Sequence, residues 1–182
     1  MIRNSDYIYK NILIADNKNT TLQYCKKTTG VDLSVKNLYN ISTPGAILHS
    51  GTIVGEYRQI NKSNIEVGGT VYKGWYLPQG SYICELNEGC IFGSSDVGYI
   101  FPRSSLNRNG VSLISAVWDP GFTTKNEKGD VYPMSVRITV DAIRGVYVEE
   151  NARVAQLLVF RADKDSLQYG LDGHQFQGKG LF

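Results

Sequence analysis

Apolar and polar side chains alternate along several short stretches of the chain, which is the pattern of strands with one buried face and one wet face. The clearest stretch covers residues 134–140, where every second residue is apolar. Residues 70–72 and 81–84 are rich in β-branched and aromatic side chains, which favour strands. Gly68-Gly69 and Arg144-Gly145 punctuate these runs as turns. The pattern therefore predicts many short strands arranged as a sandwich or barrel.

Helical patterns are sparse. Residues 16–27 would allow a short helix, although their apolar spacing is poor. The segment Ser104–Arg108 follows Pro102 and is expected to form one helical turn.

We predict an all-β domain over residues 1–167, a distorted β-barrel or jelly roll with one short helix. Residues 168–182 contain four glycines and are expected to form a tail that stays flexible until something orders it.

Composition narrows the class of protein. The 182 residues suffice for one domain, and a hydrophobic share of 42% allows a buried core. A net charge of +2 gives no electrostatic footprint for a nucleic acid polymer or an anionic membrane. The sequence shows neither a run of about 20 apolar residues nor an apolar signal core, so we expect a cytoplasmic protein. Its three cysteines match no zinc pattern and are expected to be idle thiols, so any metal would be a hard cation.

Two arginines flank two serines in the segment Arg103–Arg108. If Ser104 and Ser105 open a helical turn, their N–H groups and hydroxyls converge on a point that favours an anion. Arg103 and Arg108 would add charge-assisted hydrogen bonds to phosphate. On spacing alone, an ordinary serine-capped helix with solvated arginines is the commoner outcome.

Two aspartates occupy positions suited to chemistry. Asp119 ends an apolar strand and precedes a Pro-Gly turn, where a rigidly held carboxylate can orient and deprotonate a water. Asp32 interrupts an apolar pair on an expected strand, where it can hold the water shell of Mg²⁺. For both residues an ordinary turn aspartate is the commoner role.

Polar groups near the C-terminus offer further contacts. Gln156 lies on a strand with apolar residues on both faces, and its amide needs partners, either neighbouring backbone or a ligand phosphate. In the tail, glycines allow close wrapping, Phe176 can stack on a base and Lys179 can meet a phosphate. The alternative for these last residues is a disordered tail.

Taken in order, these motifs resemble the dUTPase/dCTP-deaminase superfamily from about residue 30 to residue 180. The Arg103–Arg108 segment is highly specific. The segments 118–121 and 150–156 look more like the deaminase-like dUTPases of archaea and some bacteria. The segments that carry the resemblance are Gly30-Val31-Asp32-Leu33, Leu77-Pro78-Gln79-Gly80-Ser81-Tyr82, Arg103–Arg108, Trp118-Asp119-Pro120-Gly121-Phe122, Ala152-Arg153-Val154-Ala155-Gln156-Leu157 and Phe176-Gln177-Gly178.

The resemblance implies a dUTPase-like (β-clip) fold and a homotrimer with three shared active sites. It implies that dUTP is hydrolysed to dUMP and pyrophosphate with Mg²⁺ as cofactor. Asp119 would activate the attacking water, and Asp32 would contact the metal only through water. The implied substrate-binding residues are Arg103, Ser104, Ser105, Arg108 and Gln156 for the phosphates, Ala116 and Val117 for the pyrimidine, and Phe176, Gln177 and Lys179 in the closing tail.

The superfamily also contains dCTP deaminases, which resemble one another in a strand bearing a proton-shuttling glutamate. The matching strand here, 134–140, has no glutamate, and Arg137 is a poor shuttle because its pKa stays above about 12. Glu127 and Asp130 would substitute only if the polar loop 123–130 folds back into the site. We therefore favour dUTP diphosphatase. The alternatives are a dCTP deaminase, alone or bifunctional, and a non-catalytic protein that binds nucleotide or a protein partner on this fold.

Overall fold

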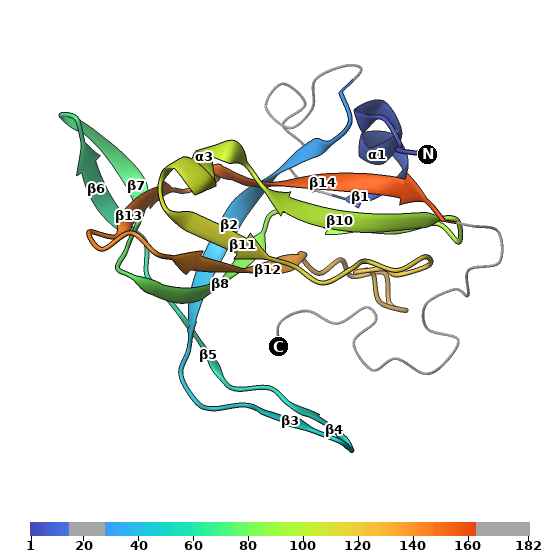
Figure 1. Ribbon diagram of the computed structural model, residues 1–182, viewed down its shortest axis with the longest axis horizontal. Coiled ribbons are helices and arrows are strands. Elements are labelled where there is room, and N and C mark those ends of the chain that lie inside the picture. Colours follow the sequence, from blue (N-terminus) through green and yellow to red (C-terminus); the bar gives the residue numbers. More distant parts are fainter. Residues whose placement is uncertain (15–27, 163–182) are drawn as a thin grey trace.

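The computed structural model describes residues 1–14 and 28–162 (Figure 1). The possible helix at 16–27 and the predicted tail 168–182 lie outside the described residues. The helices are α1 (Ser5–Asn11) and α3 (Ser104–Arg108), and the strands are β1 (Leu13–Ile14), β2 (Val31–Ile41), β3 (Ala46–Leu48), β4 (Gly51–Ile53), β5 (Tyr57–Gln59), β6 (Ser63–Val67), β7 (Thr70–Leu77), β8 (Gly80–Leu86), β9 (Gly89–Cys90), β10 (Asp96–Pro102), β11 (Val111–Ile114), β12 (Ser135–Val140), β13 (Val146–Glu149) and β14 (Arg153–Arg161).

A single antiparallel sheet forms the body of the protein. Its strand order is β10-β14-β2-β8-β12-β11, and β5 pairs with β2 off this path. The two edge strands, β10 and β11, approach one another and are joined in sequence through α3. The sheet therefore curls into a nearly closed barrel, which confirms the predicted all-β barrel with a short helix at Ser104.

Two smaller sheets extend from the body. Strands β13, β7 and β6 form a three-stranded sheet beside α3, and β3 pairs with β4 in a hairpin. Figure 1 shows this hairpin as an arm that leaves the body beyond β2 and β5. The arm, residues 42–56, is largely exposed, whereas the hydrophobic core lies inside the barrel.

Strand β12 shows how the sequence pattern becomes the core. Val136, Ile138 and Val140 are buried, and the alternate residues of the strand, among them Arg137, face outward. This confirms the alternation read from residues 134–140, and the residue pattern also placed β7 and β8 correctly.

The N-terminal helix α1 was not predicted. Asn4 caps it by accepting a hydrogen bond from the Tyr7 N–H, and Ile8 is fully buried. Asp96 of β10 accepts hydrogen bonds from both Arg3 and the Tyr7 hydroxyl, which ties the helix to the barrel. A helix of seven residues is stabilised by such docking and carries too short an apolar stripe to be recognised beforehand. Neither helix within 1–14 and 28–162 is long and apolar enough to cross a membrane.

The thiols of Cys84 and Cys90 are buried and unpaired, as expected. Burial raises the pKa of both thiols well above the ordinary value, so they stay protonated and unreactive. Cys25 lies outside the described residues.

Gly98 of β10 is a point where the backbone leaves no room for a side chain. A Cβ placed there would come 2.6 Å from Cε1 of the Phe92 ring and 3.3 Å from Cβ of Trp118. The same glycine exchanges two backbone hydrogen bonds with Trp118, of 2.8 and 3.0 Å. Close packing at Gly98 therefore fixes the 118 segment against β10.

We predict that Gly98→Ala lowers the free energy of unfolding by about 1–3 kcal/mol, because the Phe92 ring has to move out of its packed position. Chemical denaturation followed by tryptophan fluorescence measures the change. Lys36→Ala, at an exposed position of β2, serves as the control and should shift the value by less than about 0.5 kcal/mol. Equal stability of the Gly98→Ala variant and wild type would contradict the packing argument.

Candidate functional site

Three neighbouring strands bring several predicted site residues to one surface. Asp32 of β2 lies directly opposite Gln156 of β14, and Gln156 lies opposite Phe101 of β10. Arg103 follows β10 immediately, and its N–H donates to the Val154 carbonyl. Antiparallel pairing thus places residues from distant parts of the sequence in one row. We call the group Asp32, Arg103, Ser104, Ser105, Arg108, Arg153 and Gln156 the arginine cluster.

Asp32 is held between two guanidinium groups. Its Oδ1 lies 3.3 Å from Arg103 Nε, and its Oδ2 accepts a hydrogen bond of 3.0 Å from Arg153 Nη1. The Asp32 side chain is 12% exposed, whereas the arginines keep 30% and 36% of their surface in solvent. The carboxylate is therefore an anchor that orients both arginines while part of each arginine side chain stays in solvent.

The serines of the predicted phosphate motif open α3 as expected, but they do not cap it. The N-cap is Arg103, which makes no side-chain capping hydrogen bond. Arg108 Nη2 donates a 3.2 Å hydrogen bond to Ser104 Oγ. Ser105 and Arg153 line a hollow of about 300 Å³ below the helix, whose wall also includes Glu149. This surface carries three arginines and two serine hydroxyls but few carboxylates. Its positive charge therefore suits a polyanion.

Gln156 is half-buried and packs over the start of β2. A Cβ at Gly30 would lie 2.8 Å from Gln156 Cγ and 2.9 Å from Cδ, so only glycine leaves space for this amide side chain. Within the described residues, no hydrogen bond to the Gln156 amide is recorded, so the backbone partner considered from the sequence is not observed. No other described residue therefore engages the amide, which makes it a candidate donor to a ligand.

Asp119 lies on a well-defined turn. Phe122 N–H donates to the Asp119 carbonyl at 3.0 Å, Pro120 occupies the second position, and Gly121 has φ of 80°. This combination is typical of a type II turn, in which the third residue needs a positive φ. The turn fixes the Asp119 backbone, and its side chain is exposed.

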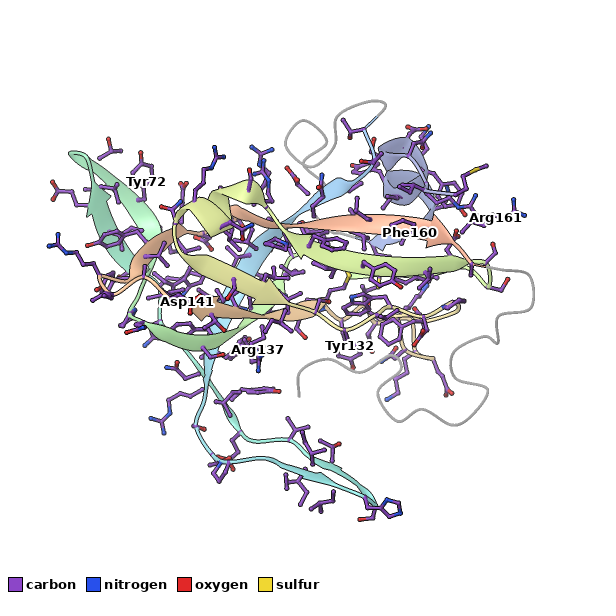
Figure 2. All side chains as sticks on the ribbon, in the orientation of Figure 1. Tyr72, Tyr132, Arg137, Asp141, Phe160 and Arg161 are labelled. Carbon is purple, nitrogen blue, oxygen red and sulfur yellow. The ribbon has the colours of Figure 1, made fainter. Side chains whose placement is uncertain are left out.

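A second hollow, of about 470 Å³, adjoins the segment before Asp119. We call it the Ala116 hollow; it is lined by Tyr57, Ile83, Ile114, Ser115, Ala116, Ser135, Val136 and Arg137. Val117, which was grouped with Ala116 as a base-reading residue, is 47% exposed and is not part of this lining. Figure 2 shows Arg137 on the side of the body from which the arm extends.

The arginine cluster and the Asp119 turn do not meet in one chain. Trp118 pairs with Gly98, whereas Arg103 follows the far end of β10, five residues further on. At about 3.3 Å per residue this is a backbone separation of roughly 16 Å. Because the bridge is antiparallel, the chain continues from Trp118 to Asp119 away from Arg103. The described chain thus presents two separate candidate half-sites: the arginine cluster, and Asp119 on the turn that follows the segment lining the Ala116 hollow.

The loop 123–130 forms a hairpin of its own and does not enter either half-site. Lys125 pairs with Val131, and the Asn126 side chain accepts a hydrogen bond from the Asp130 N–H. Neither Glu127 nor Asp130 lines the Ala116 hollow.

The predicted tail residues Phe176, Gln177 and Lys179 lie outside the residues that the structure describes. Across 1–14 and 28–162, no group of three His, Cys, Asp or Glu side chains is arranged to hold a metal ion.

Two arginines at the site were not in the predicted set. Arg153 lies within the matching motif, but its pairing with Asp32 spans 121 residues, so local spacing does not reveal it. Arg137 was considered only as a replacement for a glutamate, and its place in the Ala116 hollow follows from the sheet. The sequence did offer one signal for Arg137: in the alternating stretch 134–140 it falls at a polar position, which predicts an outward-facing side chain.

Comparison with known proteins identifies a matching family. A family model described as dCTP deaminase-like matches residues 5–162. The probable deoxyuridine 5'-triphosphate nucleotidohydrolase of Halobacterium salinarum is 32% identical over 148 residues, which cover 80% of this chain and 81% of that protein. The protein of the same name from Aeropyrum pernix is 32% identical over 154 residues, covering 84% of each.

Among solved structures, the 2'-deoxycytidine 5'-triphosphate deaminase from Agrobacterium tumefaciens superposes with a TM-score of 0.52 at 14% identity. The superposition covers 81% of this chain and 41% of that chain, and it supports the fold alone. With the family model matching residues 5–162 and relatives at 32% identity, this chain belongs to the dCTP deaminase-like family.

Proposed function

We propose that the protein is a dUTP diphosphatase, which hydrolyses dUTP to dUMP and pyrophosphate. The observation that carries the proposal is a pair of candidate half-sites: a cluster of arginines and serines suited to a triphosphate, and an aspartate on a fixed turn that follows a segment lining a hollow of the size of a small ligand. The relatives in Halobacterium salinarum and Aeropyrum pernix are named as probable enzymes of this kind, which supports the same reaction.

The complete site would form between copies of the chain in a homotrimer. Roughly 16 Å of strand separates the half-sites within one chain, more than the short side chains of Ser105 and Asp119 span. A head-to-tail arrangement brings one copy's cluster to the next copy's Asp119 and closes as a ring. An apolar surface next to the cluster supports such packing: Tyr99 and Phe101 are 37% and 46% exposed, and Phe160 packs edge-on against Tyr99.

In this arrangement the pyrimidine occupies the Ala116 hollow and the phosphates extend to the neighbouring arginine cluster. Arg103, Arg108 and the serine hydroxyls neutralise and orient the phosphate oxygens, with the Gln156 amide as a further donor. Asp119 orients a water and accepts its proton. The water oxygen bonds to the α-phosphorus, the bond to the bridging oxygen breaks, and pyrophosphate leaves with that electron pair. Positioning and charge neutralisation supply most of the rate enhancement.

Mg²⁺ fits the site as a companion of the substrate. Asp32 is the carboxylate nearest the predicted phosphates, and both of its oxygens already face guanidinium groups. A magnesium ion commonly keeps several waters and is held largely by substrate phosphates. We propose that it binds with dUTP and supplies charge neutralisation, with Asp32 reaching it through water. Phe176, Gln177 and Lys179 are proposed to close over the nucleotide from the tail.

A dCTP deaminase is the second candidate, favoured by the description of the family model. A deaminase of this family needs a carboxylate at the pyrimidine. Within the described residues, none lines the Ala116 hollow. The carboxylate of Glu85, on the neighbouring strand β8, accepts hydrogen bonds of 2.7 Å from Asn37 and 3.1 Å from the Tyr39 hydroxyl. Burial of the Tyr39 hydroxyl, together with the neighbouring charge of Glu85, raises the pKa of Tyr39 to about 12, so Tyr39 stays protonated as a donor to Glu85. These contacts engage Glu85 and favour the diphosphatase.

Incubation of the purified protein with dUTP and Mg²⁺ should release pyrophosphate, whereas dCTP should release no ammonia. Asp119→Asn is expected to lower kcat about 10²–10⁴-fold, because the general base is lost while phosphate binding remains. Coupled assays for pyrophosphate and for ammonia measure both activities. Ammonia from dCTP would establish the deaminase instead. Tight dUTP binding without turnover would favour the non-catalytic alternative.

The role of Asp32 is separable from that of the metal. Asp32→Asn removes the charge between Arg103 and Arg153, so both guanidiniums lose their orientation. We expect KM for dUTP to rise about 10-fold, the scale of one charge-assisted contact, and the Mg²⁺ concentration for half-maximal rate to rise by less, because Asp32 reaches the ion only through water. Steady-state kinetics at varied Mg²⁺ measures both. A large shift in the Mg²⁺ requirement at unchanged KM would show instead that Asp32 acts mainly on the ion.

A further inference from the structure

One charged side chain lines the Ala116 hollow, and it belongs to Arg137. In the strand register Arg137 lies opposite Ile114 of β11 on one side and Ile83 of β8 on the other, and both isoleucines also line the hollow. The aliphatic part of Arg137 therefore has apolar neighbours on both sides, which suits the way arginine packs its stem and presents its head.

The Arg137 guanidinium is not engaged elsewhere in the described part of the chain. No hydrogen bond or ion pair joins it to another residue of 1–14 or 28–162, unlike Arg103 and Arg153, which both contact Asp32. Tyr57, at the root of the arm, Ser115 and Ser135 complete the polar part of the lining. The hollow thus combines isoleucine walls with one accessible cluster of N–H donors.

Hydrogen-bond chemistry then distinguishes the pyrimidines. A guanidinium has five N–H donors, accepts no hydrogen bond and remains charged at all working pH values. Uracil presents a carbonyl oxygen at C4, which accepts from such a donor. Cytosine presents an amino group at C4, whose N–H donors would face the N–H donors of the guanidinium and leave both without a partner.

We propose that Arg137 selects pyrimidines with a carbonyl at C4, an inference that rests on the proposed function. The Ala116 hollow would then accept dUTP and reject dCTP. The strand that bears a proton-shuttling acid in the deaminases would then bear a residue that reads the base. Arg137 is a specificity residue and takes no part in the attack on the α-phosphorus.

The test compares binding of the two product monophosphates, dUMP and dCMP, so that it does not depend on turnover. Isothermal titration calorimetry of wild type should give a preference for dUMP of about 10- to 100-fold, the range expected for one charge-assisted hydrogen bond. Arg137→Met keeps the apolar stem but removes the donors, and it should lower dUMP affinity and bring the preference close to one. Arg137→Lys, which keeps a donor, should retain part of the preference.

Arg144→Met is the matched control, because Arg144 is an exposed arginine on the turn before β13 and lines neither hollow. Its dUMP preference should equal that of wild type. Thermal unfolding of each variant verifies that the fold is intact, as expected for an exposed position. An unchanged preference in a folded Arg137→Met variant would overturn the proposal, as would an equal loss of affinity for both monophosphates, which would indicate general attraction to phosphate.

The same proteins separate this inference from the function on which it rests. If wild type hydrolyses dUTP, Asp119→Asn does not, and Arg137→Met keeps the wild-type ratio of kcat/KM for dUTP and dCTP, then the reaction stands and the role of Arg137 is wrong. If wild type binds dUMP selectively through Arg137 without Mg²⁺-dependent turnover, then base selection stands and the diphosphatase proposal is wrong.

Discussion

Strand β10 sets the geometry on which the candidate site depends. One end is bonded to Trp118 through Gly98, and the other leads directly into Arg103 and α3. The strand is paired along its whole length with β14, so its two ends cannot approach each other. A chain built in this way presents its anion-binding residues and its fixed carboxylate at separate places, and a reaction that needs both calls for a second copy. In the proposed homotrimer, assembly would be part of the chemistry and not only of stability.

The Asp32 carboxylate organises the anion-binding half. Its pairing with Arg103 and Arg153 keeps two guanidiniums in place and leaves their outer donors exposed. Such preorganisation matters more than the strength of the ion pairs themselves, because partly exposed pairs contribute little to folding. The half-site of Asp119 is built differently. A Pro-Gly turn fixes the Asp119 backbone, and the adjoining sheet face supplies the Ala116 hollow.

Local sequence patterns predicted the parts of the fold that depend on local physics. The alternation at 134–140 identified β12, and the serine pair after Pro102 located α3. The Pro-Gly sequence after Asp119 identified its turn. The arm of residues 42–56 was not anticipated, since two short strands without a buried face carry no alternation. Helix α1 escaped notice because seven residues that bury mainly Ile8 carry too short a signal.

The sequence proposed a set of candidate site residues, but their arrangement was not predictable from it. The contact between Arg153 and Asp32 joins positions 121 residues apart, and the place of Arg137 in the Ala116 hollow depends on its neighbours in two other strands. The separation of Asp119 from the serines also needed the pairing of Trp118 with Gly98. These are tertiary relations, and the resemblance to a family supplied the roles of the residues without their positions.

Subunit complementation tests the shared site most directly. A variant with a defective cluster, Ser105→Ala combined with Arg103→Ala, and the Asp119→Asn variant should each be inactive alone. When the two chains are mixed after denaturation and refolded together, a site that takes its cluster from one copy and Asp119 from another should be intact in about a quarter of cases. Recovery of about that share of wild-type dUTP hydrolysis is the predicted result. Mixed assemblies, verified by mass, that remain as inactive as the parent variants would contradict a site shared between copies.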